Sequence, residues 1–404
     1  MEEATANVAK PKRPLGEILR VFLKLGCISF GGPVAHLGYF HTEFVQKRRW
    51  LDDATYGDLV ALCQFLPGPA SSQLVFALGQ RERGWRGGLL ASMGFTLPSA
   101  VLMILFAYGV ATLGDLQHAG WLHGLKLAAV AVVAQAVWGM GRNLCPDRAR
   151  LTIAAGAAVL LLVQPGAALQ VGVIAAGGAL GWALFRQQSP AQGTAPAADW
   201  RHHLVAGSLL ALFFVLLLGL PLVAAATGWQ GLAVFDSFYR AGSLVFGGGH
   251  VVLPLLRAEV VPPGWVTDDV FLAGYGAAQA LPGPLFTLSA FLGTSFQPGT
   301  HAWLGGIWCL VGIFLPAILL IAGALPFWAQ LRTKAWSTAA LKGANAAVVG
   351  VLLAALYNPV WTEGVKNAPD VAAAVAAFAL LHWWKVPPWL VVILTAAAGQ
   401  WLLG

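Results

Sequence analysis

Residues 22–32 read FLKLGCISFGG and residues 238–248 read FYRAGSLVFGG, so one glycine-terminated apolar pattern occurs twice in this chain. The likeness continues downstream, because residues 64–69 (QFLPGP) match residues 279–284 (QALPGP). Further matches follow in the same order: Glu43 with Glu259, Leu97-Pro98 with Leu315-Pro316, and Leu125-Lys126 with Leu341-Lys342. So many matches in one order indicate a duplicated unit.

The composition places both copies in a membrane. The chain has 404 residues, of which 58% are hydrophobic and only 10% charged, whereas a soluble domain carries about 25% charged residues. Apolar runs such as 204–222 and 307–324 do not alternate polar with apolar residues, which argues against a barrel. The net charge of +7 comes from basic residues in short loops, so no nucleic-acid partner is expected. An all-α polytopic membrane protein is the predicted fold class.

The order of the apolar segments predicts how the two copies are related. The second copy begins after an odd number of predicted crossings, which places it upside down relative to the first. We therefore predict two inverted-topology repeats of about six helices each, plus an extra helix that leads the second repeat. The predicted boundaries are residues 1–186 for the first repeat, 187–200 for a Pro- and Gln-rich linker, and 201–404 for the second repeat.

The loop charges predict a cytoplasmic N-terminus, because basic residues gather in alternate loops on the side of Lys10, Lys12 and Arg13. The basic run Lys47-Arg48-Arg49 disagrees if the first segment crosses fully. A re-entrant hairpin made by the first two segments would remove that conflict. The number of crossings therefore stays open.

Two kinds of helix break are expected to build a ligand site near the membrane midplane. Proline lacks a backbone donor and clashes with the preceding turn, so Pro-Gly-Pro should break a helix and leave free N–H groups at the start of the next half-helix. A second break is expected at the glycine pairs. The predicted site residues at these breaks are Phe30, Gly31, Gly32, Gln64, Pro67, Gly68, Pro69, Ser71, Phe246, Gly247, Gly248, Gln279, Pro282, Gly283 and Pro284. A simple kink or a tight helix crossing is the alternative.

Charged residues within apolar segments add a preference for anions. Burying a charge at a helix centre costs at least about 2.5–3.5 kcal/mol, so such residues mark functional sites unless they reach the interface. The predicted anion-binding cations are Lys24, Lys126, Arg240 and Lys342, and the candidates for proton coupling are His36, Glu43, His250 and Glu259. For the last four, an interfacial salt bridge or an ordinary hydrogen bond is the alternative. No phosphate loop or metalloprotease motif occurs, so we expect no cofactor, no metal and no enzymatic activity.

The pattern of residues 30–33 (FGGP), Glu43, residues 50–51 (WL) and residues 64–69 (QFLPGP) resembles the chromate ion transporter family. The second half repeats it from Phe246 through Pro284 and continues with NAAVVG at residues 345–350. The resemblance covers nearly the whole chain and is typical of the long, two-domain form. It implies export of chromate, a sulfate analogue, across a bacterial inner membrane, driven by the membrane potential or the proton gradient.

These observations together predict a secondary transporter whose partners are an oxyanion and the lipid bilayer, with a homo-oligomer left open. A transporter or channel for another oxyanion such as sulfate is the main alternative. A membrane-embedded enzyme acting on a lipid phosphate is a further alternative. It would need a nucleophile or metal cluster near the basic residues, and the sequence shows none.

Overall fold

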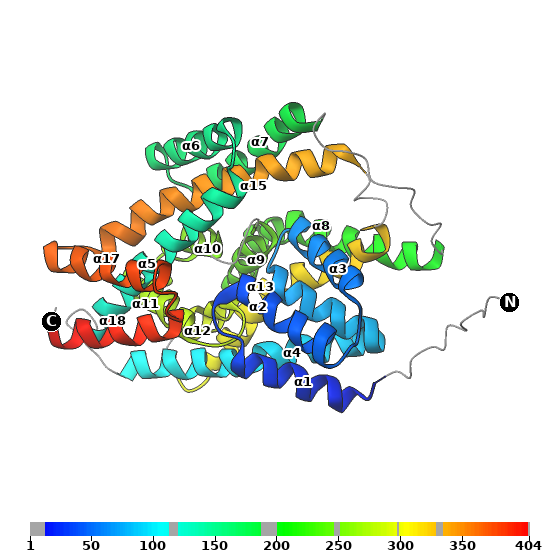
Figure 1. The fold of residues 1–404 in the computed structure, drawn as a ribbon, viewed down its shortest axis with the longest axis horizontal. Helices are drawn as coiled ribbons and strands as arrows, with labels where there is room; N and C mark the ends of the chain where they lie inside the picture. Colours follow the sequence, from blue (N-terminus) through cyan, green and yellow to red (C-terminus); the bar gives the residue numbers. More distant parts are fainter. Residues whose placement is uncertain are drawn as a thin grey trace.

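The computed structural model describes residues 13–112, 120–186, 200–245, 251–296, 299–328 and 334–402, and these form helices joined by short connections (Figure 1). The glycine motif at 246–250, with Phe246, Gly247, Gly248 and His250, and linker residues 187–199 lie outside the described residues. Within these described ranges, six helices are long and apolar enough to cross a membrane: α4 (Ala70–Thr112), α5 (Gly120–Leu144), α7 (Ala167–Phe185), α8 (Trp200–Thr227), α13 (Ala302–Ala324) and α15 (Ala335–Ala355). The predicted all-α polytopic membrane fold is confirmed.

The first half opens with a helix that is broken where its glycines lie. Helix α1 (Leu15–Ile28) ends before Phe30, and α2 (Gly32–His41) begins at Gly32. At this junction Gly31 and Gly32 adopt φ values of 93° and 76°. Such positive φ values are open to glycine at little cost. A short π-helical segment, η1 (Thr42–Lys47), continues α2 and leads to α3 (Asp53–Phe65).

Asp52 begins α3 by accepting a hydrogen bond from the backbone N–H of Thr55 at 2.7 Å. This bond, made to the charged form, holds the pKa of Asp52 below its usual range. Thr267 caps α11 (Asp268–Ala280) in the same way, through the backbone N–H of Val270. The two copies thus start their third helix with the same device.

The second half repeats this order of elements. Helix α9 (Gln230–Ser243) is followed by α10 (Val252–Val260) and α11, and the chain then breaks at Pro282–Pro284. Gly283 has φ 94° and its equivalent Gly68 has φ 115°, so both proline-glycine breaks place glycine in the left-handed region. A 3₁₀ turn, η4 (Leu285–Thr287), then leads to α12 (Leu288–Ser295).

After each proline-glycine break the chain forms a tight helical hairpin. Helix α4 is interrupted at Arg83 and Gly84, which lie outside helical φ and ψ. A Cβ atom added to Gly79 would collide with the carbonyl oxygen of Gly87 across this hairpin. Gly293 and Gly305 make the equivalent contact between α12 and α13. Small residues allow the two backbones to approach this closely.

The remaining helices are exchanged between the halves. Helix α5 of the first half packs against α17 (Ala368–His382) and α18 (Pro388–Leu402), while α15 of the second half packs against α6 (Arg148–Val163) and α7. Figure 1 shows α6, α7, α15 and α17 apart from the group formed by α1 to α4. The second half also contains three short segments: η5 (Leu325–Phe327), η6 (Leu356–Trp361) and α16 (Thr362–Gly364).

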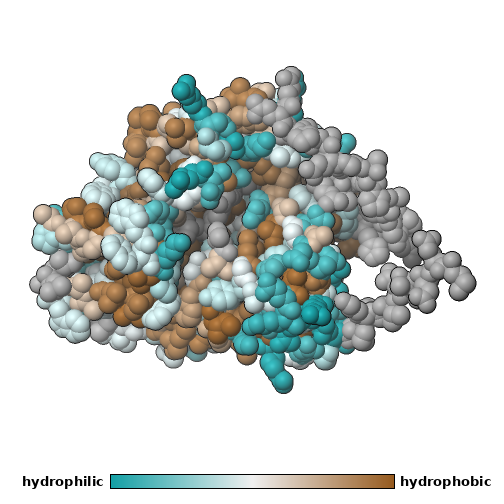
Figure 2. Space-filling view, in the orientation of Figure 1, coloured by the Kyte–Doolittle hydropathy of each residue, from teal (hydrophilic) through white to brown (hydrophobic). Residues whose placement is uncertain are grey.

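Helix α8 precedes the second copy of the repeated pattern and packs against α9 and α13. It shields α9, where the Tyr239 hydroxyl donates to the Phe213 carbonyl at 3.1 Å. Its other face is apolar and exposed, as expected of a lipid-facing helix. In Figure 2 hydrophobic residues cover much of the visible face, and hydrophilic ones gather over the region of α1 to α3.

Candidate functional site

The two proline-glycine breaks lie against the opposite half of the chain. The Gly68 N–H donates to the carbonyl of Val245 at 2.6 Å, and the Gly283 N–H donates to the carbonyl of Ser29 at 2.9 Å. Ser29 and Val245 are equivalent, because each directly precedes a Phe-Gly-Gly motif. Each half thus supplies one donor and one acceptor to the other, which is the pattern of a two-fold symmetric contact. The proline-glycine break of each half is therefore joined to the residue that precedes the glycine motif of the other half.

Buried polar groups surround the break at Gly283. The Nε2 atom of His36 lies 3.0 Å from the same Ser29 carbonyl, and the His36 side chain is fully buried. The Ser29 hydroxyl and the His36 Nδ1 atom have no hydrogen-bond partner among the described residues. A Cβ atom at Gly283 would lie 2.7 Å from the Ser99 hydroxyl, so only glycine fits here without movement. Two buried polar atoms without a partner among the described residues thus lie at this break.

Gln73 stabilises the proline-glycine break of the first half by a hydrogen bond, and the sequence analysis did not predict this role. Its Nε2 atom donates to the Pro67 carbonyl at 2.7 Å, and its side chain is 1% exposed. The predicted Gln64 is exposed instead, while the Nε2 atom of Gln279 is buried without a partner among the described residues. A glutamine one turn into the half-helix that follows Pro69 was the available signal, because an amide there can reach back to a freed carbonyl.

The hydroxyl groups near the breaks differ in availability. Ser71 is buried at the start of α4, and the neighbouring Ser72 hydroxyl has no partner within the described part of the chain. In the second half, the Thr287 hydroxyl donates to the Pro284 carbonyl at 2.9 Å and the Ser289 hydroxyl to the Phe286 carbonyl at 2.8 Å. Among the hydroxyls that follow the two proline-glycine breaks in the sequence, the buried one without a partner among the described residues is therefore that of Ser72, in the first half.

An open cleft of about 630 Å³ lies between α1, α2 and η1 in the first half. Its lining combines apolar, polar and charged side chains: Lys24, Leu25, Ile28, Ala35, Gly38, Tyr39, Thr42, Glu43 and Lys47. Lys24 and Glu43 were predicted from the sequence, and Phe30 lies just beyond, with its ring 6.0 Å from the ring of Trp389 in α18. The cleft thus brings together a predicted cation and a predicted acid.

Among the charged side chains that line the cleft, the acid has an ion-pair partner and the two lysines have none among the described residues. Glu43 binds Arg48 at 2.6 Å, and Arg48 also lies 3.4 Å from Glu17. Lys24 and Lys47 form no ion pair with any residue that the structure describes, and both are exposed. An ammonium group that faces a cleft without a carboxylate partner is open to an anion.

The other predicted cations lie in different surroundings. Arg240 donates to Asp236 at 3.0 Å and to Glu259 at 2.8 Å, so two carboxylates hold it. Lys126 is 12% exposed and bonds to Asp269, whereas Lys342 lies half-buried on α15. Acids thus neutralise at least two of the four predicted cations.

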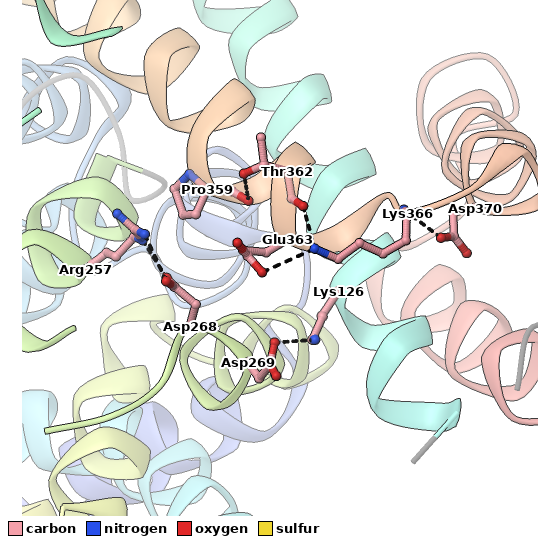
Figure 3. Close-up of polar contacts among 9 residues, drawn as sticks. All are labelled: Lys126, Arg257, Asp268, Asp269, Pro359, Thr362, Glu363, Lys366 and Asp370. Atoms are coloured by element: carbon pink, nitrogen blue, oxygen red, sulfur yellow. Dashed lines mark hydrogen bonds and ion pairs between the residues drawn. The ribbon is translucent and has the colours of Figure 1, made fainter. Parts of the chain in front are cut away.

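A network of charges at the start of α11 was also missed. Figure 3 shows Arg257 bound to Asp268 beside Lys126 bound to Asp269, and the Arg257 pair is bidentate at 2.6 and 3.0 Å. Nearby, Lys366 lies 3.4 Å from Glu363, and its backbone N–H donates to Asp370. The adjacent acids of residues 268–269 were the signal, since acids in a helix's first turn favour cations from neighbouring elements. No described group of His, Cys, Asp or Glu has the arrangement of a metal site.

Comparison with known proteins agrees with this architecture. The family model described as "Chromate transporter" matches residues 16–182 and again residues 232–400. The chain is 30% identical to the chromate transport protein of Pseudomonas aeruginosa, over 99% of this chain and 95% of that protein. It is 26% identical to a probable chromate transport protein of Synechococcus elongatus, over 96% of each chain.

A chromate transport protein of Cupriavidus metallidurans is 25% identical, over 92% of this chain and 88% of that protein. No solved structure matches the chain. The family model covers both copies of the repeat, and the relatives are matched over nearly their full length. The chain therefore belongs to the chromate transporter family and is a membrane transporter rather than an enzyme.

Proposed function

We propose that this protein is a secondary transporter that exports chromate, or a closely related dianionic oxyanion, across a bacterial inner membrane. The membrane potential or the proton gradient would drive export. The observation that carries the proposal is the open cleft in which Lys24 faces no carboxylate partner among the described residues. The names of the full-length relatives support chromate as the cargo.

The charge balance of the cleft favours an anion over a cation. Glu43 is held by Arg48, so its negative charge is already compensated. Lys24 and Lys47 add positive charge to a partly apolar lining, where attraction is stronger than in bulk water. A doubly charged oxyanion would gain from both ammonium groups at once.

The breaks offer the next stage of the path. The half-helix that begins at Ala70 carries the positive end of its dipole, and the Ser72 hydroxyl is unpartnered within the described residues. We propose that the anion moves from the cleft towards this region. The Ser29 hydroxyl and the His36 Nδ1 atom, both without a partner among the described residues, would supply further polar contacts along the path.

The membrane arrangement belongs to the same proposal. The halves would be inverted relative to each other, with boundaries at residues 1–186, 187–200 and 201–404, and the N-terminus would lie in the cytoplasm. The reciprocal bonds of Gly68 and Gly283 support a two-fold relation. The odd number of predicted crossings supports inversion.

Uptake of radiolabelled chromate into inside-out vesicles tests the function. Accumulation that needs the protein and a gradient, and that excess sulfate reduces, is the expected result. Equilibration without accumulation would indicate a channel, and no flux through folded protein would contradict chromate as the cargo.

Lys24→Gln tests the cleft within the same assay. We expect KM to rise about tenfold, which corresponds to about 1.4 kcal/mol of lost attraction. Lys334→Gln is the matched control, because Lys334 is an exposed lysine away from the cleft. Equal kinetics for both variants would rule out Lys24 as an anion contact.

A further inference from the structure

One basic and one acidic position that are equivalent in the two halves form an ion pair in one half but not in the other. The ungapped alignment that pairs Lys24 with Arg240 also pairs Glu43 with Glu259. In the second half Arg240 and Glu259 are joined at 2.8 Å. In the first half Lys24 and Glu43 line an open cleft, and Glu43 is bound to Arg48 instead. The same cation and acid positions are thus joined in one half and separated in the other.

Burial follows the same division. Tyr39 of α2 lines the cleft and is 38% exposed, whereas the equivalent Leu255 of α10 is 4% exposed. Helix α10 packs against α7 and α15, which cover it, while α2 packs mainly against η1, α3 and α4. Residues on the opposite side of these helices do not differ, because Phe40 and its equivalent Leu256 are both fully buried. The difference between Tyr39 and Leu255 thus lies on the face that forms the cleft.

We propose that the two halves exchange these states during transport. Closing the first cleft would join Lys24 to Glu43, and opening a second cleft would separate Arg240 from Glu259 and expose Leu255. Arg240 would then be the anion-binding cation of the second cleft, as Lys24 is of the first. Inverted repeats that adopt each other's conformations open a shared path to opposite sides of a membrane.

The chemistry of the Arg240–Glu259 ion pair allows a bound anion to promote the exchange. Separating Arg240 from Glu259 leaves a guanidinium group without one of its carboxylate partners. A tetrahedral oxyanion can accept hydrogen bonds from the guanidinium group through its oxygens, so it takes the place of that carboxylate. An anion in the path therefore lowers the free energy needed to open the second cleft. This inference rests on the proposed transport function but not on chromate as the cargo.

Cysteine labelling tests the exchange without any cargo. In a background with Cys27, Cys63, Cys145 and Cys309 replaced, a single cysteine at Tyr39 or at Leu255 is treated with a membrane-impermeant maleimide from each side. We expect Tyr39→Cys to label rapidly from one side, and Leu255→Cys slowly from the other. Glu259→Gln should raise the labelling rate of Leu255→Cys about tenfold, because it leaves Arg240 bound to Asp236 alone and enlarges a minor population.

Three controls accompany this measurement. Glu43→Gln is the matched variant and should not raise labelling at position 255. Leu256→Cys, on the buried side of α10, should remain unlabelled. Ala258→Cys, equivalent to the cleft residue Thr42, provides a second probe if Leu255→Cys does not fold.

A bulky adduct in the first cleft distinguishes an exchange of states between the halves from a local loosening of the second half. With Glu259→Gln present, a bulky maleimide attached first at Tyr39→Cys should hold the first cleft open and reduce labelling at position 255 about tenfold. The same adduct at Leu19→Cys, on α1 outside the cleft, should have no effect. Exchange is overturned if position 255 stays unlabelled from both sides, or if the adduct at Tyr39→Cys does not change its labelling. Absence of chromate flux with intact exchange would instead contradict only the cargo.

Discussion

At the scale of single residues, Gln73 explains how a chain with so few polar side chains tolerates a broken helix. The Pro67 carbonyl lies where the helix stops, and an unpaired carbonyl in an apolar setting costs several kcal/mol. The amide of Gln73 supplies the missing donor at 2.7 Å. The second half has Leu288 at the equivalent position, so the two breaks are stabilised differently. The halves share a backbone plan but not every side-chain contact.

Gln73→Leu should therefore destabilise the protein. The substitution keeps a similar volume but removes the donor to Pro67, so we expect a loss of about 1–3 kcal/mol and a lower unfolding temperature in detergent. Gln46→Leu is the control, since Gln46 is exposed in η1. An unfolding temperature equal to that of the control would show that the Pro67 carbonyl finds another donor.

At the scale of elements, glycine decides where helices stop and how closely they approach. Gly68 and Gly283 combine a positive φ with a backbone hydrogen bond to the other half. Gly79 against Gly87, and Gly293 against Gly305, bring the hairpin backbones together. These positions recur in both halves, because each half builds the same element from the same kind of constraint.

Gly283→Ala should impair folding or transport more than other glycine replacements. The left-handed conformation costs an alanine about 1–2 kcal/mol, and its Cβ would also press on the Ser99 hydroxyl. Gly57→Ala is the matched control, because no atom lies near its Cβ position within α3, where alanine favours the helix. Thermal unfolding of the two variants in detergent should move in opposite directions. A neutral Gly283→Ala would contradict the tight crossing.

At the scale of the whole molecule, the two halves are held together because helices of each half pack against helices of the other. Helix α5 packs with α11 and α18, and α15 packs with α6 and α7. The ion pair of Lys126 with Asp269 joins α5 to α11 across the halves. The residue equivalent to Asp269 in the first half is Ala54, so the carboxylate of this link is not repeated at the matching position.

A double-mutant cycle at Lys126 and Asp269 measures this link. Each single alanine variant should lower stability by about 1–2 kcal/mol, because it leaves a half-buried charge without its partner. The double variant should be no less stable than the worse single one, since both charges are then gone. Lys366→Ala provides the comparison, because its exposed pair with Glu363 should contribute less than about 1 kcal/mol. Strictly additive losses at Lys126 and Asp269 would show that the pair does not couple the halves.

The sequence by itself determined the membrane class, the duplication and the positions of the helix breaks. Apolar composition, repeated motifs and the backbone demands of Pro67, Gly68 and Gly283 are local properties, and local chemistry fixes them. Only the tertiary structure decided which break meets which, that Arg240 and Lys126 are bound by acids, and that Lys24 faces an open cleft. Glu259 lies 19 residues from Arg240, and Asp269 lies 143 residues from Lys126. Periodicity within a segment carries no information about which distant side chain a charge will meet, because the packing of one helix against another sets those distances.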